Sequence, residues 1–119
     1  MEFSFFRGST VKLKLSLRLA GSPVNISTDV SQIRFTCKRN LSDTFGQAVI
    51  AKYQGSGIET ISATLGTARV TITPADTLTF DDATVPMFFD VRVTDSLSNK
   101  WTPVYGRCYC VANVSNTTG

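Results

Sequence analysis

The chain of 119 residues contains no histidine. Histidine is the usual general acid or base near neutral pH, the partner of catalytic serine and cysteine, and a common zinc ligand. Its absence excludes His-based acid–base catalysis, the Ser-His-Asp and Cys-His nucleophile systems, and nearly all zinc sites. We therefore do not expect an enzyme.

Charged residues are scarce, at 18% of the chain, against about a quarter in average proteins. A calcium ion takes about six to eight oxygen ligands, but Asp76, Asp81, Asp82 and Asp95 show no ordered ligand spacing. No two carboxylates are spaced like the pair of a glycoside hydrolase. The run Gly55–Gly57 is too short for a phosphate-binding loop and has no lysine after it. We expect no metal, no cofactor and no catalytic residue.

The three cysteines do not form an even set. Cys108 and Cys110 stand two apart on one expected strand, so they point the same way with Cα atoms roughly 6.5 Å apart, which is a poor geometry for a bridge. We interpret all three as small buried hydrophobic residues of a protein folded in a reducing cytosol. The alternative is a bridge from Cys37 to Cys110 across the core.

Long apolar runs are absent, and no segment approaches the ~20 apolar residues of a membrane span. Residues 1–6 have neither a basic region nor a long apolar run, so we expect no cleaved signal peptide. The net charge is +3, but the basic residues are scattered along the chain rather than clustered as in nucleic-acid-binding proteins. We expect neither a membrane nor a nucleic acid as partner.

Alternation of apolar and polar residues is abundant and is clearest from Thr10 to Leu19, where every second residue is apolar. A strand points successive side chains to opposite faces, so this pattern predicts one face on a core and one in water. Turn signals separate similar segments, and Gly106 is expected to mark a bulge or a bend. The expected strands are 10–19, 32–39, 48–53, 68–73, 84–94, 100–105 and 107–114; residues 2–6 are a candidate short first strand and 58–61 a candidate short edge strand.

One short helical turn is expected near Pro74 to Leu78. Thr73 is a good N-cap, proline suits the first helical position, and Asp76 favours the positive end of the helix. Seven or eight short strands separated by turns at intervals of about 8 to 12 residues predict an all-β, two-sheet antiparallel sandwich. We expect residues 1–8 to be an arm or a short first strand, 9–115 the sandwich, and 116–119 a polar tail.

Aromatic residues that the expected core does not need are candidates for binding a partner. Two of them occupy positions that face away from the core, and the segment 1–8 is too short to bury all of its phenylalanines. Aromatic side chains are enriched at protein interfaces; the alternative is that they cover sheet edges or fill the ends of the core. The candidate partner-binding residues are Phe3, Phe5, Phe6, Phe88 and Tyr109.

Several segments, in this order, resemble one family. They are Phe6–Thr10, Gly21–Ile26, Ile33–Thr36, Val70–Thr77, Phe89–Asp95 and Gly106–Arg107. The set resembles the immunoglobulin-like N-terminal domain of phage baseplate upper proteins and related virion accessory proteins. The resemblance covers nearly the whole chain. It implies an immunoglobulin-like sandwich, no cofactor and no catalytic residue.

The resemblance implies a structural protein of the virion, made in the cytoplasm of the bacterial host. It would act as a capsid cement or decoration protein, or as a neck, tail or baseplate accessory. Its partners would be other virion proteins, such as major capsid, portal, neck, tail or baseplate proteins, and it would be a symmetric homo-oligomer or present in several copies. Binding would use strand edges, loops and the N-terminal segment, whose removal should leave the sandwich folded. The alternative is a receptor- or glycan-binding module using Tyr53, Trp101 and Tyr105.

Overall fold

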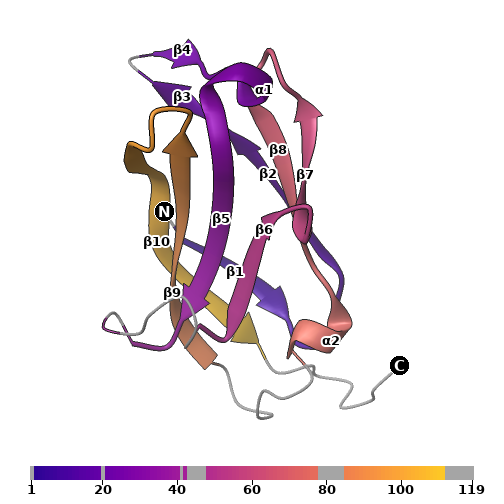
Figure 1. Ribbon diagram of the computed structural model, residues 1–119. Coiled ribbons are helices and arrows are strands. Elements are labelled where there is room, and N and C mark those ends of the chain that lie inside the picture. The colour runs from indigo at the N-terminus through magenta and orange to yellow at the C-terminus, as the bar shows by residue number, and fades with distance from the viewer. Residues whose placement is uncertain (1, 20, 41, 43–47, 78–84, 112–119) are drawn as a thin grey trace.

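The computed structural model describes residues 2–19, 21–40, 42, 48–77 and 85–111 (Figure 1). Within these ranges the elements, in chain order, are β1 (Glu2–Phe6), β2 (Val11–Ser16), β3 (Arg18–Leu19), β4 (Ser22–Pro23), α1 (Ile26–Asp29), β5 (Val30–Lys38), β6 (Ile50–Gln54), β7 (Gly57–Ser62), β8 (Thr67–Ile72), α2 (Pro74–Thr77), β9 (Val85–Asp95) and β10 (Lys100–Val111).

Eight strands form one mixed sheet in the order β1-β10-β9-β5-β6-β7-β8-β2, and β3 pairs with β4 in a separate sheet. The prediction of an all-β fold is confirmed. The expectation of purely antiparallel pairing is wrong, because β1 runs parallel to β10 and β6 runs parallel to β7. The physical reason is that alternation specifies which face of a strand is buried but says nothing of its neighbour or its direction.

The large sheet curls until it is nearly closed, so that residues on its inner face pack against one another (Figure 1). The shortest strand pairing in this sheet is that of β6 with β7. It consists of two residue pairs, Tyr53–Gly57 and Gln54–Ile58. The strands at its two edges are β1 and β2, which are neighbours in sequence.

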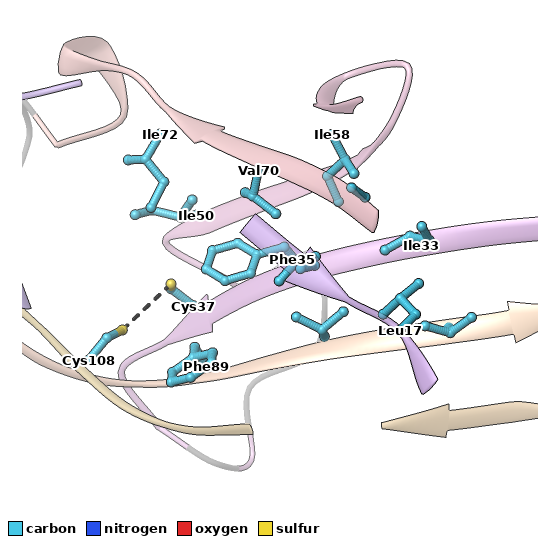
Figure 2. Close-up of a cluster of buried hydrophobic side chains, with 14 of the residues drawn as sticks. Leu17, Ile33, Phe35, Cys37, Ile50, Ile58, Val70, Ile72, Phe89 and Cys108 are labelled. Atoms are coloured by element: carbon cyan, nitrogen blue, oxygen red, sulfur yellow. Dashed lines mark hydrogen bonds between the residues drawn. The ribbon is translucent and has the colours of Figure 1, made fainter. Parts of the chain in front are cut away.

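The core forms from the inward positions that alternation predicts. Side chains from β5, β6, β8 and β9 meet around Phe35, which is only 1% exposed (Figure 2). Burial of the predicted inward residues is confirmed for Ile33, Phe35, Cys37, Val70, Ile72, Met87, Phe89, Val91, Val93, Cys108 and Cys110. Ala112, also predicted to face inward, lies outside the described residues.

The two strands predicted at 100–105 and 107–114 are one strand, β10, as far as Val111. Its irregularity falls between Trp101 and Val104 rather than at the predicted Gly106, which pairs regularly with Phe89. The register shifts where the strand carries Pro103, which has no N–H for the ladder. Proline was thus the better indicator of the bulge than glycine.

All three cysteines are free and buried, as predicted. The sulfur atom of Cys37 lies 3.7 Å from that of Cys108 (Figure 2). The fold therefore places Cys108, rather than the alternative partner Cys110, beside Cys37. The hydrogen bond with Cys108, together with burial, raises the pKa of Cys37, and burial raises the pKa of Cys110 to about 11. Only a thiolate is strongly nucleophilic, so the raised pKa values of Cys37 and Cys110 disfavour their reaction at neutral pH.

The described chain has two helical turns rather than the predicted one. The first, α1, was not predicted; Asn25 caps it, and the Asn25 side-chain oxygen accepts a hydrogen bond from the Ser27 N–H at 3.1 Å. The predicted turn is confirmed as α2, although Leu78 lies outside the described residues. Thr77 of α2 is fully buried, and its hydroxyl accepts a hydrogen bond of 2.8 Å from the Gly8 N–H, which ties α2 to the β1–β2 connection.

Asp76 joins α2 to the sheet. One carboxylate oxygen accepts hydrogen bonds from the N–H and hydroxyl of Thr73 at 2.7 and 3.0 Å, and the ammonium of Lys52 on β6 lies 2.8 Å from the same oxygen. Burial alone would raise the pKa of Asp76, but the hydrogen bonds from Lys52 and Thr73, with the charge of Lys52, hold it below the ordinary value of 3.8. The ionised carboxylate therefore stabilises the fold.

Replacing Asp76 by asparagine should lower the free energy of unfolding at pH 7 by about 1–2 kcal/mol, because a helix cap and an ion pair are both weakened. Since the pKa of Asp76 is lower in the folded state, its stabilisation is complete above the unfolded value and is lost as the pH falls through the folded value. Wild type should therefore lose stability below about pH 5 more steeply than the variant. Urea titrations at several pH values measure this difference.

The matched control is Glu59→Gln. Glu59 forms an ion pair with Arg69 at 2.9 Å, but its side chain is 62% exposed. An exposed pair contributes roughly 0–1 kcal/mol, so this variant should change stability little. Equal pH dependence in wild type and the Asp76→Asn variant would contradict the assigned role of Asp76.

Candidate binding face

The outward-pointing residues of β1, β10, β9, β5 and β6 form one continuous surface, because strand partners in register point to the same side of the sheet. We call this surface the outer face. In register across it lie Arg107, Phe88 and Lys38, and next to them Tyr105, Asp90, Thr36 and Ala51. The outer face comprises Glu2, Ser4, Phe6, Arg34, Thr36, Lys38, Ala51, Tyr53, Pro86, Phe88, Asp90, Arg92, Tyr105, Arg107 and Tyr109.

Aromatic side chains stand out on this face. Tyr105 is 71% exposed and Tyr53 is 44% exposed, although both are large residues. Phe88 is half-buried, and the guanidinium of Arg107 lies over its ring, 5.5 Å from the centroid. This cation–π contact holds the two side chains in a defined arrangement at the surface.

The outer face is hollowed beside Phe88. A depression of about 430 Å³ lies between β10, β9 and β5, and it is lined by Thr36, Lys38, Phe88, Phe89, Asp90, Thr102, Tyr105, Gly106 and Arg107. A smaller hollow of about 80 Å³ adjoins it over Arg34, Thr36, Lys38, Asp90 and Arg92. The two hollows share three lining residues, so together they form a single concave area in the middle of the face.

Basic residues that are scattered in the sequence gather around this concave area. Arg34 and Lys38 come from β5, Arg92 from β9 and Arg107 from β10. The acidic residue among them is Asp90, which faces both hollows. The concave area therefore combines the aromatic residues Phe88 and Tyr105 with four basic side chains, which we call the basic rim.

The five predicted partner-binding residues separate into two groups. Phe6, Phe88 and Tyr109 lie on the outer face, where Phe6 is 53% exposed. Phe5 instead points inward and is 5% exposed, so its ring belongs to the core rather than to a binding surface. Phe3 also points inward and is half-buried; its ring centroid lies 4.8 Å from that of Phe89 in an edge-to-face contact.

Of the three residues suggested for glycan binding, Tyr53 and Tyr105 share the outer face. Trp101 does not join them, because it is half-buried and packs against the core. Its indole N–H is enclosed and has no hydrogen-bond partner among the described residues.

Sequence reasoning named Tyr105 as a candidate for glycan binding but did not group it with Phe88 and the basic rim as parts of one site. The signal that could have found them is again alternation, since each of these residues stands at an outward position of its strand. To group these residues, one must also know that β10, β9 and β5 are neighbours. That strand order is set by tertiary pairing.

The described residues contain no group of three or more metal-ligating side chains placed to hold an ion. Neither α1 nor α2, each four residues long, could cross a membrane, and the described part of the chain has no longer apolar helix. Comparison with protein-family models and with curated protein sequences gives no match.

Proposed function

We propose that this chain is a non-enzymatic structural protein of a bacteriophage particle that binds other virion proteins through its outer face. The observation that carries the proposal is the concave area, whose lining includes Phe88, Tyr105 and Arg107. Aromatic residues and arginine are the side chains most enriched at protein interfaces and at their energetic hot spots. A depression beside them provides room for a side chain of the partner.

The basic rim specifies the chemistry of the partner. Four cationic side chains outnumber Asp90 and Glu2, which is in register with Arg107, and so favour an acidic protein surface by charge complementarity. A phosphate backbone offers no cation to pair with Asp90, which favours a protein partner over nucleic acid. One carboxylate is readily matched by an arginine or lysine of a protein.

We also propose the finer architecture and the family. The support for a two-sheet, immunoglobulin-like sandwich is the narrow contact at β6–β7, which divides the large sheet into β1-β10-β9-β5-β6 and β7-β8-β2. Support for the virion role is the ordered resemblance of six segments to phage baseplate domains. Locating the protein in assembled virions would show whether it belongs to the capsid, neck, tail or baseplate.

The test replaces Phe88, Tyr105 and Arg107 by serine together. Particles assembled with this variant should carry at least about tenfold less of the protein than wild-type particles, because hot-spot side chains contribute roughly 2 kcal/mol or more each. Mass spectrometry of purified particles measures the copy number, and a thermal melt confirms that the variant is folded.

The matched control removes exposed apolar side chains elsewhere, by Ile61→Ser and Leu65→Ser, which are 45% and 63% exposed in the wild type. This variant should be incorporated normally. Wild-type protein absent from particles would refute the virion role, and full incorporation of the triple variant would refute the role of the outer face.

A second candidate is glycan binding, favoured by Tyr53 and Tyr105 on the same face beside polar groups such as Thr36 and Asp90. A glycan array separates the two functions. Binding that is lost in the triple variant would assign the outer face to a sugar, whereas silence of the array together with particle incorporation favours the protein partner.

A further inference from the structure

The two edge strands of the large sheet, β1 and β2, line opposite sides of one groove. The groove has a volume of about 440 Å³ and includes Glu2 and Phe3 of β1 and residues 12–16 of β2. Neither edge has a further strand paired to it within the described chain. An unpaired edge presents a row of main-chain N–H and C=O groups to any extended segment that approaches it.

The floor of the groove is apolar and incompletely covered. Phe35 and Phe89 of the core lie at its bottom. Phe3, Leu13 and Val104 point inward like core residues, yet they are only half-buried. They stay half-buried at the place where the sheet does not close, so one more strand there would remove apolar surface from water.

The charges on β2 indicate which kind of added strand could pair with it. Val11, Leu13 and Leu15 point inward, while Lys12 and Lys14 point outward and are exposed. An added strand would place its outward residues opposite these lysines, where opposite charges stabilise a strand pair and like charges destabilise it. A segment that alternates apolar and acidic residues therefore matches both faces of β2.

We propose that the free edge of β2 accepts an extended segment of a partner protein, in which apolar residues alternate with aspartate or glutamate. Main-chain hydrogen bonds to β2 would provide affinity, and the apolar side chains would lie on Phe3, Leu13 and Val104. The inference deepens the proposed function, since the segment would belong to a virion protein that this domain binds.

A second copy of this chain is a poorer occupant. Two β2 edges paired antiparallel would place the lysines of one copy opposite those of the other. Lysines on an edge strand are a common means of preventing such self-association. The same lysines select for an acidic strand.

The test uses synthetic, fluorescein-labelled peptides of about nine residues, long enough to cover an edge of this length. Valine alternates with glutamate in one peptide and with lysine in the other. Fluorescence anisotropy should show that wild-type protein binds the glutamate peptide at least about tenfold more tightly than the lysine peptide, because two cross-strand charge pairs change sign. The double variant Lys12→Glu, Lys14→Glu should reverse this preference.

Two controls separate strand pairing from general charge attraction. A glutamate peptide methylated on all of its backbone nitrogens keeps its charges but has no N–H to donate on either edge, so its binding should be lost. The double variant Lys12→Ser, Lys14→Ser should lose the preference without reversing it. Thermal melts check that both double variants are folded.

No binding of the glutamate peptide by wild type, or equal binding of the methylated peptide, would overturn the proposal. The Phe88, Tyr105 and Arg107 triple variant should bind the peptide as wild type does. Peptide binding with failed particle incorporation would refute the virion function alone, and the reverse result would refute the edge site alone.

Discussion

Replacing Phe5 by alanine should lower the free energy of unfolding by about 3–5 kcal/mol, the usual cost of removing a buried phenylalanine ring. Phe5 is 5% exposed, and its ring lies 6.0 Å from that of Phe3. The loss includes the transfer of the ring to water and the cavity that remains, because β1 and β10 are hydrogen-bonded and cannot collapse freely into the space. Urea denaturation followed by fluorescence of the single tryptophan, Trp101, measures it.

The control is the next residue, Phe6→Ala. Phe6 points outward and is 53% exposed, so its replacement should cost less than about 1 kcal/mol. Similar losses from the two variants would show that β1 is not docked as described.

The burial of Phe5 also changes the meaning of an N-terminal truncation. Deleting residues 1–7 would remove all of β1, which pairs with β10 at five positions from Glu2 to Phe6. The truncated chain should therefore be markedly less stable, contrary to the expectation for a detachable arm. Loss of binding after truncation would reflect unfolding as well as loss of contacts, so the point variants are the sharper test.

Replacing Gly66 by alanine should destabilise the fold by at least about 2 kcal/mol more than replacing Gly21. Both residues have positive φ, +68° and +84°, which costs an alanine roughly 1–2 kcal/mol at either position. At Gly66, however, a Cβ atom would lie 2.7 Å from the carbonyl oxygens of Leu17 and Val24, whereas at Gly21 no atom lies within 4 Å.

The contacts at Gly66 are all with backbone, so no side chain can turn aside to make room. Its carbonyl also accepts a hydrogen bond of 2.8 Å from the Leu17 N–H, which holds the β7–β8 turn against the end of β2. Urea denaturation of the two variants measures the difference. Equal losses would mean that the turn can move away from Leu17.

Local pattern and tertiary arrangement contributed differently to the candidate site. Alternation correctly placed Phe88 and Tyr109 on an outward face, since the period of two is a property of any strand. It gave no reason to group Arg34, Arg92 and Arg107, which are far apart in the chain and meet only because β5, β9 and β10 are neighbours. The same limitation applies to Phe5, whose burial depends on parallel pairing of β1 with the last described strand.

The groove between β1 and β2 could not be inferred at all from local signals. Lys12 and Lys14 indicate a strand with one face in water, and that holds for a central strand as well as for an edge. Only the order of strands in the sheet shows that β2 lies at an edge, with no further strand beside it among the described residues, and that Leu13 is half-buried there.

The sequence by itself determined the all-β class, the inward residues of most strands, the α2 turn and the burial of the cysteines, because each depends on short-range alternation, capping or composition. Only the tertiary structure decided the mixed strand order, the nearly closed sheet, and the gathering of aromatic and basic residues on one face. The physical reason is that strand partners are chosen by contacts between residues distant in the chain, and a strand of given pattern can satisfy its buried face beside many different neighbours.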